Sequence, residues 1–366
     1  MLIDIVGGAR PNFVKIASLV HAVQKQQESG ASVGIRVVHT GQHYDEMMSG
    51  NFFTDLGIPT PDLNLQVGSG TQAEQTGAIM VGYEKAVQEA KPDLCLVVGD
   101  VTSTMACAIT ARKCGVPVAH VEAGIRSGDW TMPEEINRVV TDSIANWYYT
   151  TTKHASNNLV QSGVSESQII WVGNTMIDTL LRFDEHFVQP GLWESLSLSK
   201  GDYLVVTLHR PSNVDSEADL IEKLEAISAA AGKVRIVFPV HPRTAAVLGE
   251  RVLSFSNVSL VDPLRYLEFN YLVKNAMGVI TDSGGITEET TVFGIPTITL
   301  RDSTERPETV TMGTNELAGI QSDAIAPLLT KLLNNDWKVG RIPEKWDGKA
   351  GERIISHVLS HSTLSA

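Results

Sequence analysis

The stretch Thr281-Asp282-Ser283-Gly284-Gly285-Ile286-Thr287-Glu288-Glu289 decides the fold class of this chain. It follows a short apolar run, 277–280, that is typical of a buried strand, and it leads into a run, 287–293, that is typical of a helix. Glycines at such a turn let the backbone come close to an anion. The free N–H groups at the start of the helix then point at that anion, backed by the helix dipole. The stretch therefore predicts an α/β domain that binds phosphate, with Glu289 one turn into the helix and within reach of ribose hydroxyls.

Strand-like and helix-like runs alternate along the whole chain, and they form two series. This alternation is typical of parallel, doubly wound sheets, so we expect two Rossmann-like domains that face each other across a cleft. We place the boundary after residue 172, which gives domains 1–172 and 173–349, with a C-terminal helix at 350–366 that joins the first domain. Ligands of such sheets bind beyond the carboxyl ends of the strands. The predicted strands are 2–6, 35–39, 94–98, 118–121 and 169–171 in the first series and 203–208, 234–240, 258–261, 278–281 and 297–300 in the second, with helices such as 11–24 and 103–113 between strands.

Composition narrows the class of protein. The 366 residues are 43% hydrophobic and 19% charged, which fits two folded domains with real cores. A net charge of −13 disfavours nucleic acid or an anionic membrane as a partner. The three cysteines form no CxxC pair, which is typical of reduced thiols. Because the sequence shows neither a signal peptide nor a membrane-length apolar run, we expect a cytoplasmic protein.

Two cations lie in the first strand-to-helix turn, within the segment GARPNFVK at 8–15. Arg10 and Lys15 could neutralise a diphosphate or position a carboxylate, although a solvated surface pair is an equal alternative. The turn lacks the GxGxxG spacing, so NAD is not expected as a cofactor.

Three carboxylates follow in the first half of the chain. Asp100 comes directly after the strand 94–98, and its alternative role is to cap the next helix. Glu122 ends an apolar strand, which is an unfavourable place for a carboxylate without a task or a partner. Glu134 falls in the first turn of the next helix, where favourable placement in the helix dipole is the alternative. Because clustered carboxylates drive their pKa values apart, these three suit acid–base chemistry.

The second half adds basic groups at strand ends. His209 is a natural general acid near neutral pH, and Arg210 suits a bidentate phosphate contact. For His241, a structural role and a functional role are equally open. No HExxH-type spacing is present, so we expect no metal, and Ser283 lacks the GxSxG setting of a serine hydrolase.

Together these segments resemble the non-hydrolysing UDP-N-acetylglucosamine 2-epimerase family. The hydrolysing relatives carry Ala-Asp-Phe-Gly where this chain has Pro-Asn-Phe-Val at 11–14. The motifs that carry the resemblance, in order, are GARPNFVK, HTGQHYD, VVGDVTST, HVEAGIRS, MPEEINR, VGNTMIDTL, TLHRPSN, VFPVHPRT, TDSGGITEE and RDSTERPETV.

The resemblance implies a two-domain fold like that of the glycosyltransferase-B group, with a UDP-sugar in the cleft. It implies inversion of C2 of the sugar without a cofactor, by elimination of UDP to a 2-acetamidoglucal and re-addition on the other face. It also implies a homodimer and a role in cell-surface polysaccharide biosynthesis. One contact that is usually polar in the family falls on Leu264. The family's acid–base positions fall on Asp100, Glu122, Glu134 and His209, and its nucleotide-sugar contacts fall on Arg10, Lys15, Phe269, Ser283, Gly284, Gly285, Glu289 and Arg306.

Three other functions stay open on the sequence. A slightly short segment between Glu122 and Glu134 is shared with relatives that act on UDP-2,3-diacetamido-2,3-dideoxyglucuronate. A UDP-sugar glycosyltransferase needs an acceptor site, which the sequence does not show. A non-catalytic UDP-sugar-binding module leaves the carboxylates and His209 unexplained. The segment 43–46 only partly matches the pattern of relatives that bind a second UDP-sugar as activator, so the sequence does not predict such activation.

Overall fold

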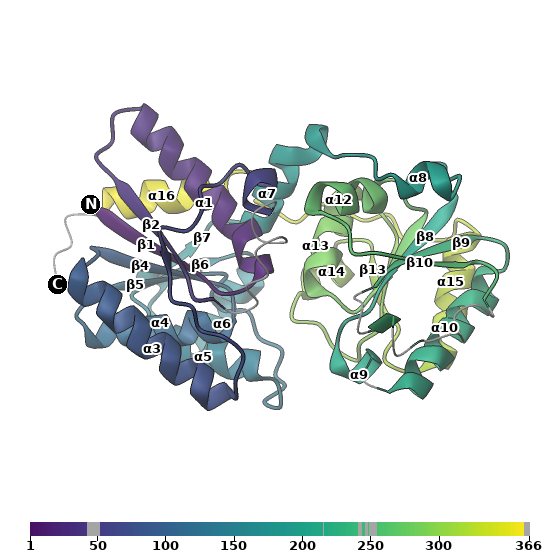
Figure 1. Cartoon of the computed structure of the whole chain (residues 1–366), viewed down its shortest axis with the longest axis horizontal. Helices are drawn as coiled ribbons and strands as arrows, with labels where there is room; N and C mark the ends of the chain where they lie inside the picture. The colour runs from purple at the N-terminus through teal and green to yellow at the C-terminus, as the bar shows by residue number, and fades with distance from the viewer. Residues whose placement is uncertain (42–51, 215, 241–243, 246–247, 249–254, 362–366) are drawn as a thin grey trace. The chain divides into compact units, whose positions relative to one another are not determined.

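The structure is a computed structural model, and it describes residues 1–41, 52–214, 216–240, 244–245, 248 and 255–361. It consists of two compact units (Figure 1). Unit 1 contains Met1–Arg182 and Glu344–Ala366, and unit 2 contains Phe183–Pro343.

Unit 1 is built on a parallel sheet of seven described strands in the order β3-β2-β1-β4-β5-β6-β7. All five residues of β4 are buried, as expected for a strand covered by helices on both faces. Helices α3, α4 and α5 lie side by side on one face, and α1 lies beside α16 on the other (Figure 1). The strands are β1 Leu2–Gly7, β2 Gly34–His39, β3 Leu63–Asn64, β4 Leu94–Val98, β5 Val118–Val121, β6 Trp147–Thr150 and β7 Ile169–Trp171; the helices are α1 Arg10–Glu28, α3 Gln72–Glu89, α4 Thr102–Lys113, α5 Pro133–Ile144, α6 Lys153–Gln161, α7 Thr175–Phe183 and α16 Ala350–Ser360.

Unit 1 extends about ten residues past the boundary that we placed after residue 172. The reason is that side chains of α7 form hydrogen bonds with other helices of unit 1. The hydroxyl of Thr179 donates to the carbonyl of Val14 at 2.6 Å. The buried carboxylate of Asp178 accepts from the hydroxyl of Ser18 at 2.7 Å and from the backbone N–H of Gly351 at 2.7 Å. These bonds attach α7 to both α1 and the first turn of α16.

Unit 2 repeats the design with a parallel sheet of six described strands in the order β10-β9-β8-β11-β12-β13. Its core contains aliphatic residues of β8, β9 and β11 packed against α10 and α15. The strands are β8 Tyr203–Thr207, β9 Arg235–Pro239, β10 Val258–Val261, β11 Gly278–Thr281, β12 Thr297–Thr299 and β13 Asn315–Leu317; the helices are α8 Leu192–Ser195, α9 Pro211–Val214, α10 Glu217–Ala231, α12 Tyr266–Lys274, α13 Gly284–Phe293, α14 Pro307–Thr311 and α15 Ile325–Leu333.

The predicted α/β class with two parallel sheets is confirmed. One detail differs: α13 begins at Gly284, three residues before the helical run that we expected. Both glycines of the turn therefore belong to the first helical turn, where backbone N–H groups lack intrahelical partners.

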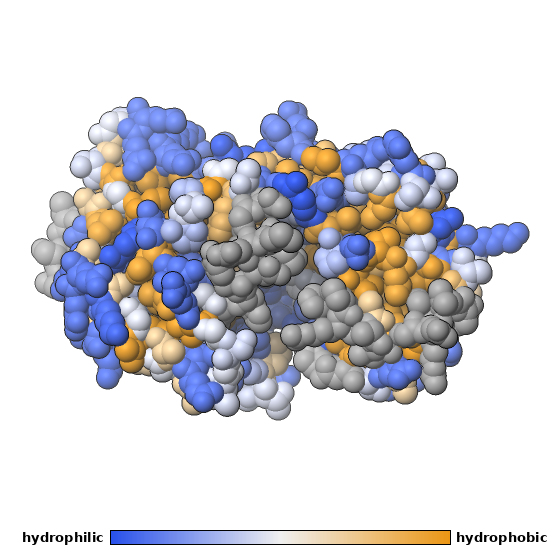
Figure 2. Space-filling model, in the orientation of Figure 1, coloured by the Kyte–Doolittle hydropathy of each residue, from blue (hydrophilic) through white to orange (hydrophobic). Residues whose placement is uncertain are grey.

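The face of each unit that Figure 2 shows is mixed in polarity. Exposed large hydrophobic residues are scattered over different elements, for example Trp130, Val160 and Val339. Within the described ranges, no helix is both long and apolar enough to cross a membrane.

Candidate active site

In unit 1, the candidate carboxylates Asp100 and Glu122 follow neighbouring strands. The strands β4 and β5 pair in parallel, with Val98 opposite Val121, so both turns lie at the same edge of the sheet. Gly99, which directly precedes Asp100, has a φ of +71°. A Cβ at this position would lie 3.5 Å from Oε2 of Glu122 and 3.3 Å from Nζ of Lys15. A larger residue would crowd both groups, so this glycine permits the close approach.

Glu122 is a buried carboxylate with one partner and one free oxygen. Its relative exposure is 4%, and its φ of +70° is rare for a residue other than glycine. Oε2 forms an ion pair with the buried ammonium of Lys15. Oε1 is also buried and accepts no hydrogen bond from the described residues. Strained backbone and an unused buried oxygen are both features that concentrate at functional sites.

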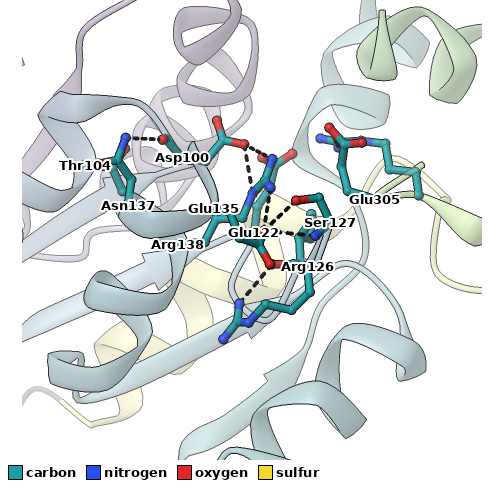
Figure 3. Close-up of polar contacts among 12 residues, drawn as sticks. Asp100, Thr104, Glu122, Arg126, Ser127, Glu135, Asn137, Arg138 and Glu305 are labelled. Atoms are coloured by element: carbon teal, nitrogen blue, oxygen red, sulfur yellow. Dashed lines mark hydrogen bonds and ion pairs between the residues drawn. The ribbon is translucent and has the colours of Figure 1, made fainter. Parts of the chain in front are cut away.

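Asp100 is held by α5 but remains accessible (Figure 3). Arg138 donates to its Oδ2 from Nε at 3.0 Å and also from Nη2. Asn137 donates to the backbone carbonyl of Asp100 at 2.9 Å. The side chain of Asp100 keeps 26% of its surface exposed, whereas that of Arg138 keeps 3%. The arginine therefore fixes a carboxylate that a ligand can still reach.

Arg138 is oriented in turn by Glu135 (Figure 3). Its Nη1 donates to Oε2 of Glu135 at 2.9 Å. Glu135 also accepts from the backbone N–H groups of Ser127 and Gly128. Burial acts to raise the pKa of Glu135, but these hydrogen bonds outweigh it and lower the pKa. The neighbouring candidate Glu134 is half-buried, and its carboxylate has no hydrogen bond or ion pair with the described residues.

The other two candidates of unit 1 lie on α1. Asn12 fixes the first turn of this helix, because it accepts from the N–H of Ala9 at 3.0 Å and donates to the carbonyl of Val98 at 3.0 Å. The helix therefore docks directly on the end of β4. Lys15 reaches Glu122 from it, and the exposed Arg10 lies over the ring of Phe52, with 5.1 Å from Cζ to the ring centroid.

In unit 2, His209 and Asp282 form a dyad at the ends of β8 and β11. Nδ1 of His209 lies 2.8 Å from Oδ1 of Asp282. Asp282 is fully buried and also accepts from the backbone N–H groups of His209 and Arg210 and from Nδ2 of Asn213. Burial acts to raise the pKa of Asp282, but these bonds outweigh it and lower the pKa. An ionised Asp282 orients the ring, while the side chain of His209, which is 63% exposed, can offer Nε2 to a ligand.

The glycine turn of unit 2 meets a guanidinium group. A Cβ at Gly284 would lie 3.4 Å from Nη1 of Arg306, so the guanidinium group lies directly beside this turn. Nε of Arg306 lies 2.7 Å from a carboxylate oxygen of Glu288. The N–H of Ser283 donates to the hydroxyl of Thr281, whereas Gly284 and Gly285 are in the first turn of α13, where N–H groups lack intrahelical partners. Such N–H groups beside a cation suit phosphate.

Glu289 is buried one turn into α13, beside α12. Burial raises the pKa of its carboxyl to about 8, and the neighbouring Glu288 adds to the rise. Tyr266 and Asn270 of α12 partly oppose this rise. Phe269, on the same helix α12, is half-buried against the core of unit 2.

Leu264 is half-buried against the core cluster that contains Phe269 and also lines a depression near the ends of β9 and β10. An apolar side chain therefore stands where the resemblance implies a polar contact.

Arg210 and Arg301 share one carboxylate. Nη2 of Arg210 lies 3.4 Å from Oε1 of Glu305, and Nη2 of Arg301 lies 2.6 Å from its Oε2. Burial opposes ionisation of Glu305, but Arg306 and Arg301 outweigh it and lower its pKa to about 2. These arginines are therefore held in place by a permanent negative charge.

Sequence reasoning did not single out three of these residues: Arg138, Glu135 and Asp282. Asp282 was recognisable in principle, because an aspartate directly after a strand resembles Asp100. The candidates His241 and the segment 43–46 lie outside the described residues.

Comparison with known proteins gives consistent results. The sequence model of the UDP-N-acetylglucosamine 2-epimerase family matches residues 25–359. The chain is 39% identical to a UDP-N-acetylglucosamine 2-epimerase of Methanocaldococcus jannaschii, over 97% of this chain and 98% of that one. It is 40% identical to a UDP-2,3-diacetamido-2,3-dideoxy-D-glucuronate 2-epimerase of Pseudomonas aeruginosa, over 96% and 97%. Among solved structures, a crystal structure of the M. jannaschii UDP-GlcNAc 2-epimerase in complex with UDP-GlcNAc and UDP superposes with a TM-score of 0.88 at 38% identity and covers 98% of this chain and 100% of that one.

Proposed function

This chain belongs to the UDP-N-acetylglucosamine 2-epimerase family, and we propose that it is an isomerase that interconverts UDP-N-acetylglucosamine and UDP-N-acetylmannosamine. The observation that carries the proposal is the pair of carboxylates on neighbouring strand ends, each with its own cation: Glu122 with Lys15, and Asp100 with Arg138. Two carboxylates, each fixed by its own cation, suit a reaction that moves one proton between the two faces of a carbon atom.

The reaction needs no redox step. A carboxylate takes the proton from C2, and the electrons of the C–H bond form a C1=C2 double bond. At the same time the C1–O bond breaks, and UDP leaves with the electron pair of that C1–O bond. Re-addition of UDP to C1 with protonation of C2 on the other face gives the epimer. Asp100 and Glu122 are the proposed proton carriers, and Glu134 is the next candidate. The unused Oε1 of Glu122 offers a basic atom at the site.

Departure of UDP places negative charge on its diphosphate, and cations stabilise that charge. We assign this role to the turn Ser283-Gly284-Gly285 with Arg306, and to Arg10 and Arg210. His209 is the proposed acid at the leaving group, because Asp282 orients its ring. Lys15 fixes Glu122, and Phe269 and Glu289 are assigned to the nucleoside, where Glu289 meets the ribose hydroxyls.

Proton NMR of UDP-N-acetylglucosamine incubated with the protein in D2O tests the proposal. We expect deuterium at C2 and the appearance of the second epimer. Glu122→Gln should abolish both signals, whereas Glu166→Gln, which changes an exposed carboxylate of unit 1, should leave them unchanged. A C2 proton that stays unexchanged with the wild-type protein would refute the function.

A second substrate is favoured by one comparison, the 40% identity to the P. aeruginosa enzyme that epimerises a UDP-2,3-diacetamido-2,3-dideoxy-D-glucuronate. Its sugar carries a C6 carboxylate and a C3 acetamido group. Parallel measurements of kcat/KM on both UDP-sugars decide between the two substrates. If kcat/KM for the uronate exceeds kcat/KM for UDP-N-acetylglucosamine by more than about 100-fold, the uronate is the substrate. One small group that fits a pocket poorly gives a smaller difference than this.

We also propose a cytoplasmic homodimer that supplies sugars for cell-surface polysaccharide. Family membership supports the homodimer, and free cysteines, Cys95, Cys107 and Cys114, fit a reducing compartment. Light scattering of the purified protein tests the dimer: a mass near that of one chain would exclude it.

A further inference from the structure

His120 is a fully buried histidine that neither the proposed reaction nor the substrate uses. It lies in β5, two residues before Glu122, and its relative exposure is 0%. Its Nε2 lies 2.8 Å from the carbonyl oxygen of Gly99. Its Nδ1 lies 2.7 Å from Oδ1 of Asp142, on α5. Both ring nitrogens therefore face oxygen atoms at hydrogen-bond distance.

The partners of the ring fix its protons. A carbonyl oxygen only accepts, so Nε2 carries a proton. Asp142 accepts at Oδ2 from the N–H of Gly124 at 3.1 Å and from Nη1 of Arg126 at 2.6 Å. Burial acts to raise the pKa of Asp142, but His120 and Arg126 outweigh it and lower the pKa. The ion pair with the guanidinium of Arg126 favours a charged Asp142, whose Oδ1 also only accepts, so Nδ1 carries a proton as well.

We propose that His120 is a positioning residue, held as an imidazolium, that sets both turns bearing Asp100 and Glu122. One N–H fixes the carbonyl of Gly99, which directly precedes Asp100. The other N–H fixes Asp142, which holds the backbone of Gly124 just after Glu122. A single buried ring thus connects the ends of β4 and β5. The inference rests on the proposed function only for its activity readout.

Among the residues that the structure describes, we find no other hydrogen-bond partner for the ring than Gly99 and Asp142. Tyr148, on the neighbouring strand β6, pairs with His120 in the strand register. Its hydroxyl donates to the carbonyl of Ala145 at 2.8 Å, and burial raises its pKa to about 12, so it stays neutral. The charged groups around the ring are therefore Asp142 and Arg126, and Arg112 also acts on Tyr148. A neutral ring would either leave the carbonyl of Gly99 without a donor or set a lone pair against the carboxylate of Asp142, and both are unfavourable in a buried site.

Nitrogen-15 NMR of the full-length protein with labelled histidine tests the charge of the ring. We expect both nitrogens of His120 to show protonated shifts and one attached hydrogen each at pH 7.5. A single attached hydrogen on His120 would overturn the proposal. This measurement needs no variant and no substrate.

Two variants test positioning, with His154→Gln as the matched control. His120→Gln and Asp142→Asn should lower kcat by about 10- to 100-fold, because a shift of about 1 Å in a reacting group costs about 100-fold. The affinity for UDP alone should stay within about twofold, since the proposed diphosphate contacts lie largely in unit 2. Asp142→Asn is the milder change, because an amide oxygen still accepts from Gly124.

Carbon-13 shifts of the side-chain carboxyl carbons of Asp100 and Glu122 provide a readout without substrate. We expect them to move in His120→Gln and to stay unchanged in His154→Gln. A purely structural role predicts a lower melting temperature with wild-type kcat and unchanged carboxyl shifts, and that result would overturn the proposal. If the wild-type protein fails to exchange the C2 proton, the proposed function fails, while the shifts still decide the role of His120.

Discussion

Replacing Glu289 with glutamine should make unit 2 more stable near neutral pH. The carboxyl of Glu289 has a pKa of about 8 in the folded protein, against an ordinary value of 4.5, because burial and the neighbouring Glu288 disfavour its charge. Between these two values the unfolded chain has lost the proton and the folded chain keeps it. Stability therefore falls as pH rises through this window and is fully present only below pH 4.5. Glutamine does not titrate, so the variant lacks this decline.

The size of the stability loss follows from the pH range between the two pKa values of Glu289. Each pH unit within it lowers the free energy of unfolding by about 1.4 kcal/mol. Between pH 5 and pH 7.5 the wild-type protein should therefore lose about 3 kcal/mol that Glu289→Gln retains. The free energy of opening, measured by native-state hydrogen exchange of amides in β8 and β11, reports on unit 2. Glu225→Gln, which changes an exposed carboxylate on α10, is the control and should follow the wild type. A difference between Glu289→Gln and wild type that is the same at both pH values would refute the reasoning.

Three further predictions concern the site. Lys15→Met should lower the free energy of unfolding by about 3–5 kcal/mol, because it leaves the buried Glu122 unpaired; thermal melting checks this, and adding Glu122→Gln should restore most of the loss. Asp282→Asn should lower kcat by about 100-fold or more through a misoriented His209, measured by steady-state turnover, and an unchanged kcat would remove His209 from the mechanism. Dialysis against EDTA should leave turnover unchanged, because the described residues offer no cluster of three His, Cys, Asp or Glu side chains for a metal; recovery of a lost rate on adding a metal would contradict this.

The sequence predicts the sheets well where strands are continuous apolar runs. The strands 94–98 and 118–121 have their predicted bounds, because burial on both faces requires apolar residues at every position. The short strands β6 and β13 were not predicted. Trp147–Thr150 ends in polar groups, and Asn315–Leu317 has three residues, two of them polar, so neither pattern stands out from a loop.

The site is predictable in its residue types but not in its pairings. Strand ends indicated Asp100, Glu122 and His209, because polar residues after buried strands share one edge of a sheet. The partners Arg138 and Asp142 are absent from that prediction. Arg138 lies in α5, 38 positions after Asp100, and on the sequence it looks like part of an ordinary helix face. Only the packing of α5 against the strand ends brings it to the carboxylate.

The position of α16 has a consequence for how the protein is made. The ribosome releases unit 1 in two portions, residues 1–182 and then the last segment after all of unit 2. Until α16 emerges, Asp178 lacks the N–H groups of Ala350 and Gly351 that it accepts from. The segment of unit 2 therefore leaves the ribosome complete before α16 does, while unit 1 lacks its last portion until the whole chain is released. A nonsense codon near position 344 should consequently damage unit 1 and leave unit 2 able to fold.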